Sequence, residues 1–182
     1  MFRKVFFAIL LTIFLGGCQK PPNFEQEHPG AKGQPPELLG YYAAKEVHPG
    51  ETWNIYLKAK DVDGDMKYIV AVLSVEGVDS SLSSEIWLKG EDRTEFDGYI
   101  FLNTPPGEIL FEASVTKLIA NIFIRDWAGN KSQTVKLPLS FEPGRTPEEV
   151  PPQWQQAANH ELGYISNSLL GTENLGDTRR SF

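Results

Sequence analysis

The sequence predicts an all-β protein, an antiparallel β-sandwich of about seven short strands. Two observations predict it. Across residues 39–142 apolar and polar side chains alternate over short stretches, which is the pattern of strands with one face in a core and one in water. Clusters of Gly, Pro, Asn and Asp separate these stretches, at about the 8–12-residue spacing that is typical of sandwiches.

The clearest strand covers residues 53–60. Its side chains divide into an apolar face and a mostly polar face: Trp53, Ile55, Leu57 and Ala59 against Asn54, Tyr56, Lys58 and Lys60. After a turn, residues 68–75 are apolar on both faces. We therefore expect a half-buried strand followed by a central one.

Shorter strands follow at residues 86–88 and 96–102. Within the second, Asp97 and Gly98 predict either a bulge or a hairpin tip. Residues 118–124 and 134–141 form the last predicted pair, and Gly129 and Asn130 suit the turn between them. Pro138 falls on the outward phase of the final strand, which favours an edge position.

Two turns resemble those of bacterial immunoglobulin-like and fibronectin-III-like modules. They are Asp-Val-Asp-Gly-Asp at 61–65 and Arg-Asp-Trp-Ala-Gly-Asn-Lys-Ser at 125–132. The resemblance implies an Ig-like sandwich over residues 39–142, although the Cys-Trp-Cys core of antibody domains is absent. Modules of this class serve adhesion, spacing, or carbohydrate and protein binding, and the fold alone does not choose among these roles.

The N-terminus has the pattern of an export signal. Arg3 and Lys4 precede an apolar run over residues 5–15, which is too short to span a bilayer, since spanning takes about 20 residues. Gly16 and Gly17 then precede Cys18, the one cysteine of the chain. This order resembles the bacterial lipobox, so we expect residues 1–17 to be removed and Cys18 to carry lipid. A plain secretory signal with an incidental cysteine is the alternative.

The lipobox resemblance also suggests a location. Gln19 follows Cys18, and by similarity to enteric lipoproteins the absence of aspartate there favours the outer membrane over the inner one. Several acyl chains hold a protein stably in a bilayer. Residues 18–38 are rich in Pro, Gly, Gln and Glu, and we expect a flexible tether there.

Acidic composition limits the class of partner. The net charge is −7, and it becomes −9 once residues 1–17 are removed. Such a charge argues against nucleic acid, or an anionic membrane surface, as the main partner. With one mature cysteine the domain cannot form an internal disulfide, so its stability depends on its hydrophobic core.

Acidic residues also suggest a cation site. The aspartates at positions 61, 63 and 65 offer clustered oxygens of the kind calcium prefers, and Asp126 comes from the opposing turn. An EF-hand is excluded, because Met66 and Val72 occupy the loop positions where that motif needs Gly and Glu. Turn capping through side-chain hydrogen bonds is the competing interpretation. No other cofactor is expected.

Two further features are candidates for partner binding. Trp127 lies at a predicted hairpin tip, where it either packs over the core or contacts a sugar or protein. We expect residues 143–182 to form a C-terminal linker, a short amphipathic helix and a disordered tail. Trp154, Ile165 and Leu169 recur at helical spacing within residues 153–170. That stripe either docks on a partner or covers the chain's own sandwich.

Sequence motifs do not indicate catalysis. The three histidines lie apart at positions 28, 48 and 160, and no serine-hydrolase, zinc-protease or phosphate-loop motif occurs. The sequence therefore predicts a noncatalytic binding or assembly module anchored in the cell envelope, with a protein or carbohydrate partner. A carbohydrate-active or other hydrolytic enzyme, and a structural spacer without a tight partner, are the alternatives.

Overall fold

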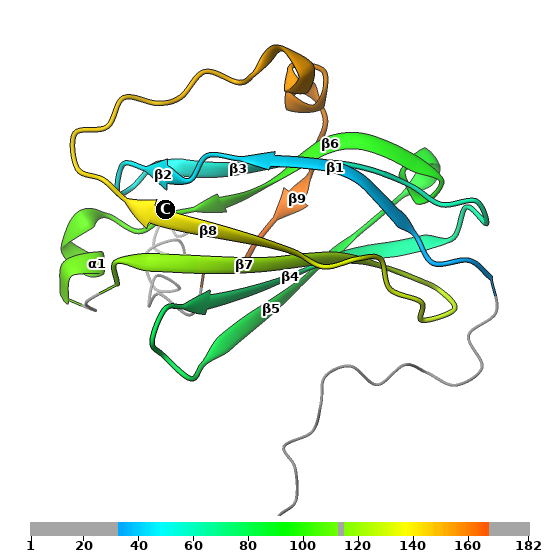
Figure 1. Cartoon of the computed structure of the whole chain (residues 1–182), viewed down its shortest axis with the longest axis horizontal. Helices are drawn as coiled ribbons and strands as arrows, with labels where there is room; N and C mark the ends of the chain where they lie inside the picture. Colours follow the sequence, from blue (N-terminus) through cyan, green and yellow to red (C-terminus); the bar gives the residue numbers. More distant parts are fainter. Residues whose placement is uncertain (1–32, 113–114, 168–182) are drawn as a thin grey trace, which may run out of the picture.

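The computed structural model describes residues 33–112 and 115–167. They form an Ig-like β-sandwich of two sheets packed face to face (Figure 1). The first sheet has the strand order β1-β3-β6-β9. Its strands are β1 (Glu37–Ala43), β3 (Thr52–Lys60), β6 (Glu95–Asn103) and β9 (Glu161–Tyr164).

The second sheet has the order β2-β8-β7-β4-β5. Its strands are β2 (Glu46–Val47), β8 (Val135–Phe141), β7 (Lys117–Asp126), β4 (Met66–Val75) and β5 (Ser81–Trp87). One short helix, α1 (Gly107–Glu112), lies in the β6–β7 connection, and a 3₁₀ turn at Gly90–Arg93 joins β5 to β6. The fold class predicted from the sequence is confirmed.

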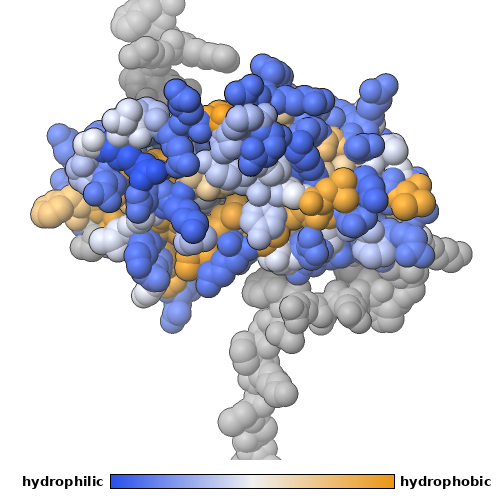
Figure 2. Space-filling model, turned by 45° about the horizontal axis from the view of Figure 1, so that its top comes forward, coloured by the Kyte–Doolittle hydropathy of each residue, from blue (hydrophilic) through white to orange (hydrophobic). Residues whose placement is uncertain are grey.

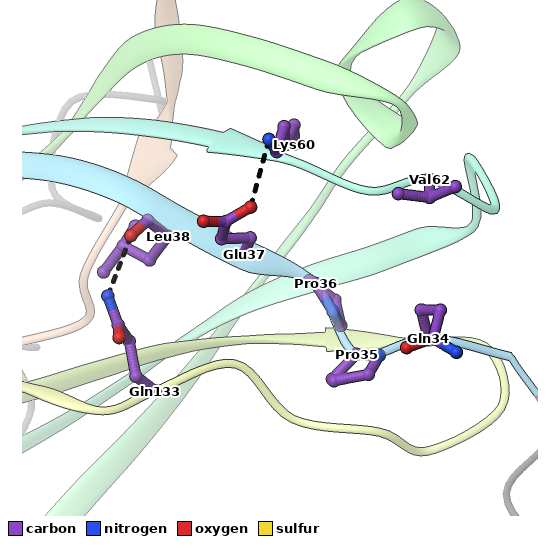
Figure 3. A pocket seen from close by; sticks show the side chains of 8 residues that line it. All are labelled: Gln34, Pro35, Pro36, Glu37, Leu38, Lys60, Val62 and Gln133. Atoms are coloured by element: carbon purple, nitrogen blue, oxygen red, sulfur yellow. Dashed lines mark hydrogen bonds and ion pairs between the residues drawn. The ribbon is translucent and has the colours of Figure 1, made fainter.

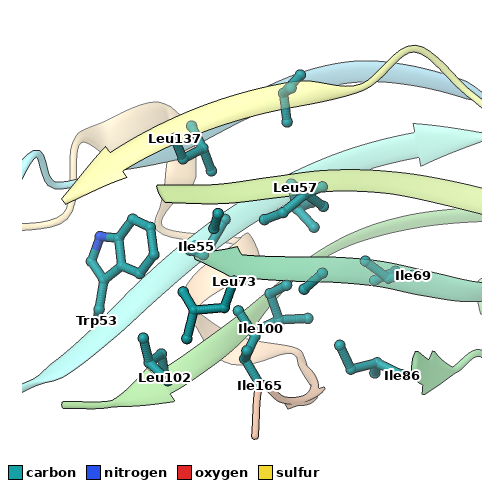
Figure 4. Close-up of a cluster of buried hydrophobic side chains, with 14 of the residues drawn as sticks. Trp53, Ile55, Leu57, Ile69, Leu73, Ile86, Ile100, Leu102, Leu137 and Ile165 are labelled. Atoms are coloured by element: carbon teal, nitrogen blue, oxygen red, sulfur yellow. The ribbon is translucent and has the colours of Figure 1, made fainter. Parts of the chain in front are cut away.

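The core lies between the sheets and confirms the predicted strand phases. Ile55, Leu57 and Ala59 of β3 are completely buried, and Trp53 is 1% exposed. Facing residues of the second sheet, among them Ile69 and Leu73, complete the cluster (Figure 4). Both faces of β4 are largely buried. The strand pairs with β5 at one edge and with β7 at the other, which confirms its predicted central position.

Strand pairing is antiparallel except at two edges. The exceptions are β2, which runs parallel to the end of β8, and β9, which runs parallel to β6. Pro138 of β8 pairs with Ile119 of β7, whereas β2 pairs only with Ser140 and Phe141 of β8. The missing N–H of Pro138 is thus accommodated along the edge portion of β8, as the sequence predicted.

Gly98 is not a hairpin tip. Strand β6 runs through it without a break, and Gly98 pairs with Leu57. A Cβ atom at Gly98 would lie 2.7 Å from the His160 carbonyl oxygen and 2.9 Å from Leu162 Cγ. The glycine therefore permits the close approach of the C-terminal segment, while the irregularity in β6–β9 pairing falls one residue later, between Tyr99 and Ile100.

The C-terminal segment differs from the amphipathic helix expected over residues 153–170. Its described part forms two 3₁₀ turns, Pro152–Trp154 and Ala157–Asn159, and then β9. Gly163 has φ +148°, which an α-helix does not contain. Trp154 and Ala157 pack on the outer face of the first sheet in a second small core, with Tyr42, Tyr56 and Tyr99 around them.

This second core closes the outer face of the first sheet. Trp154 stacks on Tyr42 with ring centroids 6.4 Å apart, and Lys58 Nζ lies 5.1 Å from the Trp154 ring. The face seen in Figure 2 is mostly hydrophilic, with apolar residues in separate patches. Of the two interpretations of the C-terminal stripe, its described part matches self-packing.

Several expectations lie outside the described residues: the signal segment 1–17, Cys18, Gln19, the tether as far as residue 32, Leu169 and the tail from residue 171. Among the described residues, no helix has the length and apolar character needed to cross a membrane.

Candidate functional site

Three aspartates meet at one end of the sandwich. Asp61 follows β3, Asp65 precedes β4, and Asp126 ends β7. Each offers a carboxylate oxygen, and these oxygens all lie within 4.8 Å of one another. Asp61 is 3% exposed and Asp126 is 2% exposed, so two of the three carboxylates are almost fully removed from bulk water.

Local turn geometry brings Asp61 and Asp65 together. Gly64 has φ +69°, a left-handed conformation that side chains other than glycine rarely adopt, and it reverses the chain within a few residues. The Asp63 N–H donates to Asp61 Oδ1 over 3.1 Å, which forms the side-chain turn predicted for this segment. The predicted turn capping therefore uses only one oxygen of Asp61, Oδ1.

The facing turn fixes Asp126 in the same way. Asp126 Oδ1 accepts a hydrogen bond from the Asn130 backbone N–H, and Oδ2 accepts one from Asn130 Nδ2, both over 2.7 Å. Gly129, at φ +93°, completes that turn. The two turns are joined through the backbone, because the Trp127 N–H donates to the Asp65 carbonyl oxygen over 3.1 Å.

Two buried oxygens of this cluster have no hydrogen-bond partner among the described residues. They are Asp61 Oδ2 and Asp65 Oδ1. Leaving a buried carboxylate oxygen unpaired is costly, at about 1–3 kcal/mol or more for a charged group. Buried carboxylates normally sit next to a cation, yet none of the salt bridges within the described residues includes Asp61, Asp65 or Asp126.

Electrostatics at the cluster favour a positive ligand. Burial raises the pKa of Asp65 from 3.8 to about 6, with further contributions from a hydrogen bond to Asp61 and from the charges of Asp126, Asp61 and Asp63. In its protonated form the Asp65 carboxyl supplies the hydrogen that Asp61 lacks. A divalent cation would serve both carboxylates at once, and hard oxygen donors such as these suit Ca²⁺.

Asp63 does not join the other three aspartates. Its Oδ2 accepts a hydrogen bond from the Gln34 backbone N–H, which ties the chain before β1 to the β3–β4 turn. Beside this contact an open groove of about 320 Å³ is lined by residues 34–38, Lys60, Val62 and Gln133 (Figure 3). The carboxylate of Asp63 thus holds the N-terminal entry into the sandwich.

Trp127 projects from the β7–β8 turn and is 54% exposed. Its ring centroid is 6.0 Å from that of Trp87, which is 50% exposed. The side chain therefore packs only partly over the core. Lys67 Nζ lies 4.5 Å from its ring, and Arg93 Cζ lies 6.0 Å from it.

Other residues predicted to bind a partner are placed differently. Trp154 is 7% exposed and Ile165 is 2% exposed, and they belong to different cores: Trp154 packs outside the first sheet and Ile165 packs between the sheets. Their helical spacing therefore does not define a single surface. Leu169 lies beyond the described residues.

Some participants could not be found by motif reading. Lys67 and Arg93 meet Trp127 only in the folded chain, from β4 and from the turn after β5. The sequence places Asn130 in the turn but does not indicate its two hydrogen bonds to Asp126. The sequence feature that could have indicated these bonds is the spacing of Asp126 and Asn130, which lie four residues apart with Gly129 between them.

Comparison with known proteins gives fold-level similarity alone. No protein-family model matches the chain, and no curated protein matches it. One similar solved structure is the PKD domain of an M14-like peptidase from Thermoplasmatales archaeon SCGC AB-540-F20. It is 15% identical, with 62% of this chain and 99% of that chain covered, at a TM-score of 0.39.

A second similar structure is a CARDB domain from Pyrococcus furiosus, solved in complex with di-metal ions. It is 10% identical, with 59% of this chain and 86% of that chain covered, at a TM-score of 0.29. At these identities and scores neither domain assigns an activity or a ligand here. The metal site proposed below rests on the carboxylates of this chain.

Proposed function

We propose that this chain is a lipid-anchored, noncatalytic envelope module whose sandwich binds Ca²⁺ at the end formed by Asp61, Asp65 and Asp126. One observation supports the metal site above all others. Asp61, which is only 3% exposed, has a carboxylate oxygen without a hydrogen-bond partner among the described residues, and it lies next to two more carboxylates. Main-chain carbonyls and water would complete the coordination, which for Ca²⁺ is about 6–8 oxygens.

Burial also separates this proposal from a hydrolytic enzyme. A glycosidase needs its two carboxylates on either side of a bound sugar, and therefore open to a cleft. Asp61 and Asp126 are only 3% and 2% exposed. A bare cation with its small radius can reach such a site, whereas a sugar ring cannot.

Calcium binding is tested by thermal unfolding of the soluble mature chain, residues 18–182 with Cys18→Ser. At a calcium concentration about 100 times its dissociation constant, ligand linkage gives about 2.7 kcal/mol of stabilisation. For a domain of this size that is a rise in Tm of about 5–10 °C. An identical Tm in calcium and in chelator would refute the site.

Neighbouring aspartates supply a matched control. Asp65→Asn removes a ligand charge within the cluster, and we expect it to abolish the calcium-induced rise in Tm. Asp63→Asn removes the same charge two residues away, and it keeps an oxygen to accept from Gln34. That variant should retain the full calcium response, and loss of the response in both variants would point to nonspecific screening.

Membrane anchoring is an independent part of the proposal, supported by the lipobox-like order ending at Cys18. Expressed with its own leader in a bacterium that processes lipoproteins, the chain should incorporate radiolabelled palmitate and fractionate with the envelope. Cys18→Ser should lose both properties. Label incorporation into the Cys18→Ser variant would contradict the assignment, as would the absence of label in the unsubstituted chain.

A further inference from the structure

An aromatic–cation patch lies on the outer face of the second sheet, next to the aspartate cluster. At its centre Lys67 Nζ lies 5.1 Å from the Tyr68 ring, 5.2 Å from the Trp87 ring and 4.5 Å from the Trp127 ring. Arg93 Cζ lies 6.0 Å from the centroid of the Trp127 ring. We define these five residues as the centre of the patch.

The patch extends along β7. Tyr68 pairs with Trp87 on one side and with Arg125 on the other, and in the next row Val70 pairs with Phe123. Arg125 Cζ lies 5.7 Å from the Phe123 ring, and Lys131 Nζ lies 4.4 Å from it. Aromatic rings and cationic groups therefore alternate across adjacent strands.

Four cations of the patch have no ion-pair partner among the described residues, although the chain is acidic. Lys67, Arg93, Arg125 and Lys131 form no salt bridge within the described residues. Glu85 lies opposite Val70 in the register, and the carboxylates of the aspartate cluster adjoin the patch at Trp127. At physiological salt, charges more than about 8 Å apart are largely screened, so a ligand on the outer face of the sheet meets these four cations more strongly than the net charge of −7 of the whole chain.

Hydrogen bonds place the patch where the chain enters the sandwich. The β3–β4 turn accepts a hydrogen bond from the Gln34 backbone N–H through Asp63, and one from the Trp127 backbone N–H through the Asp65 carbonyl. The same five-residue turn thus touches both the start of the described chain and the patch. The 32 residues that precede Gly33, Cys18 included, join the domain at this end.

From this arrangement we propose that the aromatic–cation patch docks the domain onto an anionic phospholipid surface. Lys and Arg attract phosphate headgroups, and Trp and Tyr rings are favoured at the depth of the headgroups. The inference rests on the proposed lipid anchor only for delivery to the membrane. The recognition chemistry belongs to the patch and can be tested on the chain without lipid.

The test uses residues 18–182 with Cys18→Ser, which include the whole described sandwich, in co-sedimentation with vesicles. One set contains phosphatidylcholine alone and the other includes about 30% phosphatidylglycerol. We expect binding to the anionic vesicles only, with weakening at high salt. Tryptophan emission should shift to the blue on binding, because Trp87 and Trp127 are half-exposed whereas Trp53 and Trp154 are buried.

Two double variants of equal charge separate the patch from general electrostatics. Lys67→Gln with Arg93→Gln removes two patch cations, and at about fivefold per cation near an anionic surface this should weaken binding about 25-fold. Lys45→Gln with Lys117→Gln removes two cations elsewhere, since Lys117 begins β7 and Arg125 lies near its other end. The control pair should bind as the unsubstituted chain does.

Other outcomes would overturn the inference. Equal weakening by both double variants would show that no surface is specific. Absence of vesicle binding, together with patch-dependent retention on a soluble polysaccharide or self-association that the patch variant abolishes, would assign the face to that other ligand. Calcium titration and palmitate labelling give separate readouts, so failure here leaves the metal site and the anchor intact.

Discussion

The backbone of His160 lies directly against Gly98, so that a Cβ atom at Gly98 would stand 2.7 Å from the His160 carbonyl oxygen. That oxygen already accepts a hydrogen bond from the Tyr99 N–H over 2.9 Å. There is no room for a side chain between β6 and the segment leading to β9. The absence of one methyl group in β6 thus lets the C-terminal segment join the first sheet.

Substitution of Gly98 by Ala should therefore destabilise the protein by about 1–3 kcal/mol, because added volume in a packed region displaces backbone. Gly40→Ala is the matched control, since a Cβ there would meet Trp154 at 3.4 Å, an ordinary contact. Urea unfolding of both variants checks the difference. Equal free energies of unfolding for the two variants would mean that the segment leading to β9 can move away from Gly98 without loss of stability.

Removing the last 41 residues, by truncation after Phe141, should greatly reduce stability. The truncated chain loses Trp154 and Ala157 over the first sheet and Ile165 between the sheets, all of them buried. Loss of Trp154 alone should cost about 3–5 kcal/mol on the scale of Trp→Ala substitutions in cores. Unfolding monitored by circular dichroism measures this, and unchanged stability would reopen partner docking as the role of the segment.

The two tryptophans at opposite extremes of burial should respond differently to truncation of their side chains. Trp53 is 1% exposed, and its Nε1–H donates to the Ala44 carbonyl over 2.8 Å. Trp53→Ala should cost about 3–5 kcal/mol. Because Trp127 is 54% exposed, Trp127→Ala should lower the free energy of unfolding by about 1 kcal/mol or less. A larger loss at Trp127 than at Trp53 would contradict its assignment as a surface residue.

Metal-free protein should lose stability as the pH rises from about 4 to about 6. The folded pKa of Asp65 is about 6, above its ordinary value of 3.8, so within that interval the folded state binds more protons than the unfolded state. Under linkage, stability then falls with rising pH. Asp65→Asn should remove this dependence and stabilise the metal-free chain at pH 7 by about 1–2 kcal/mol.

Measurement of Tm against pH in chelator checks this, with Asp63→Asn as the control that keeps the dependence. Calcium should reverse the effect, since it competes with the proton for Asp65 and binds more tightly above pH 6 than below it. A pH profile identical in the Asp65→Asn variant and the unsubstituted chain would show that Asp65 does not titrate in this interval.

Strands in which apolar and polar residues alternate could be predicted from the sequence, because the alternation is visible in neighbouring residues alone. Trp53, Ile55 and Leu57 needed no knowledge of their partners to be placed inward. Trp154 could not be placed in this way, since what buries it is Tyr42 and Tyr56, which lie about 100 residues earlier in the chain. Helical spacing in that segment was a coincidence of two separate packing sites.

The same distinction applies to the candidate site. Asp61 and Asp65 share one short turn, so their proximity followed from local chemistry. Asp63 was expected to join them, but the reversal at Gly64 leaves its carboxylate facing Gln34. The cations around Trp127 come from distant elements, and no local pattern in the sequence indicates that Lys67 and Arg93 converge there.

Strand β9 is the last element of the first sheet, and it pairs in parallel with β6, about 60 residues earlier in the chain. Parallel pairing over such a separation forms late, because the intervening loop must close first. Before the C-terminal segment has folded onto the first sheet, the edge of β6 that pairs with β9 is open. Tyr56 is then not covered by Trp154. The first sheet is thus completed only by a segment that follows the whole of the second sheet in the chain.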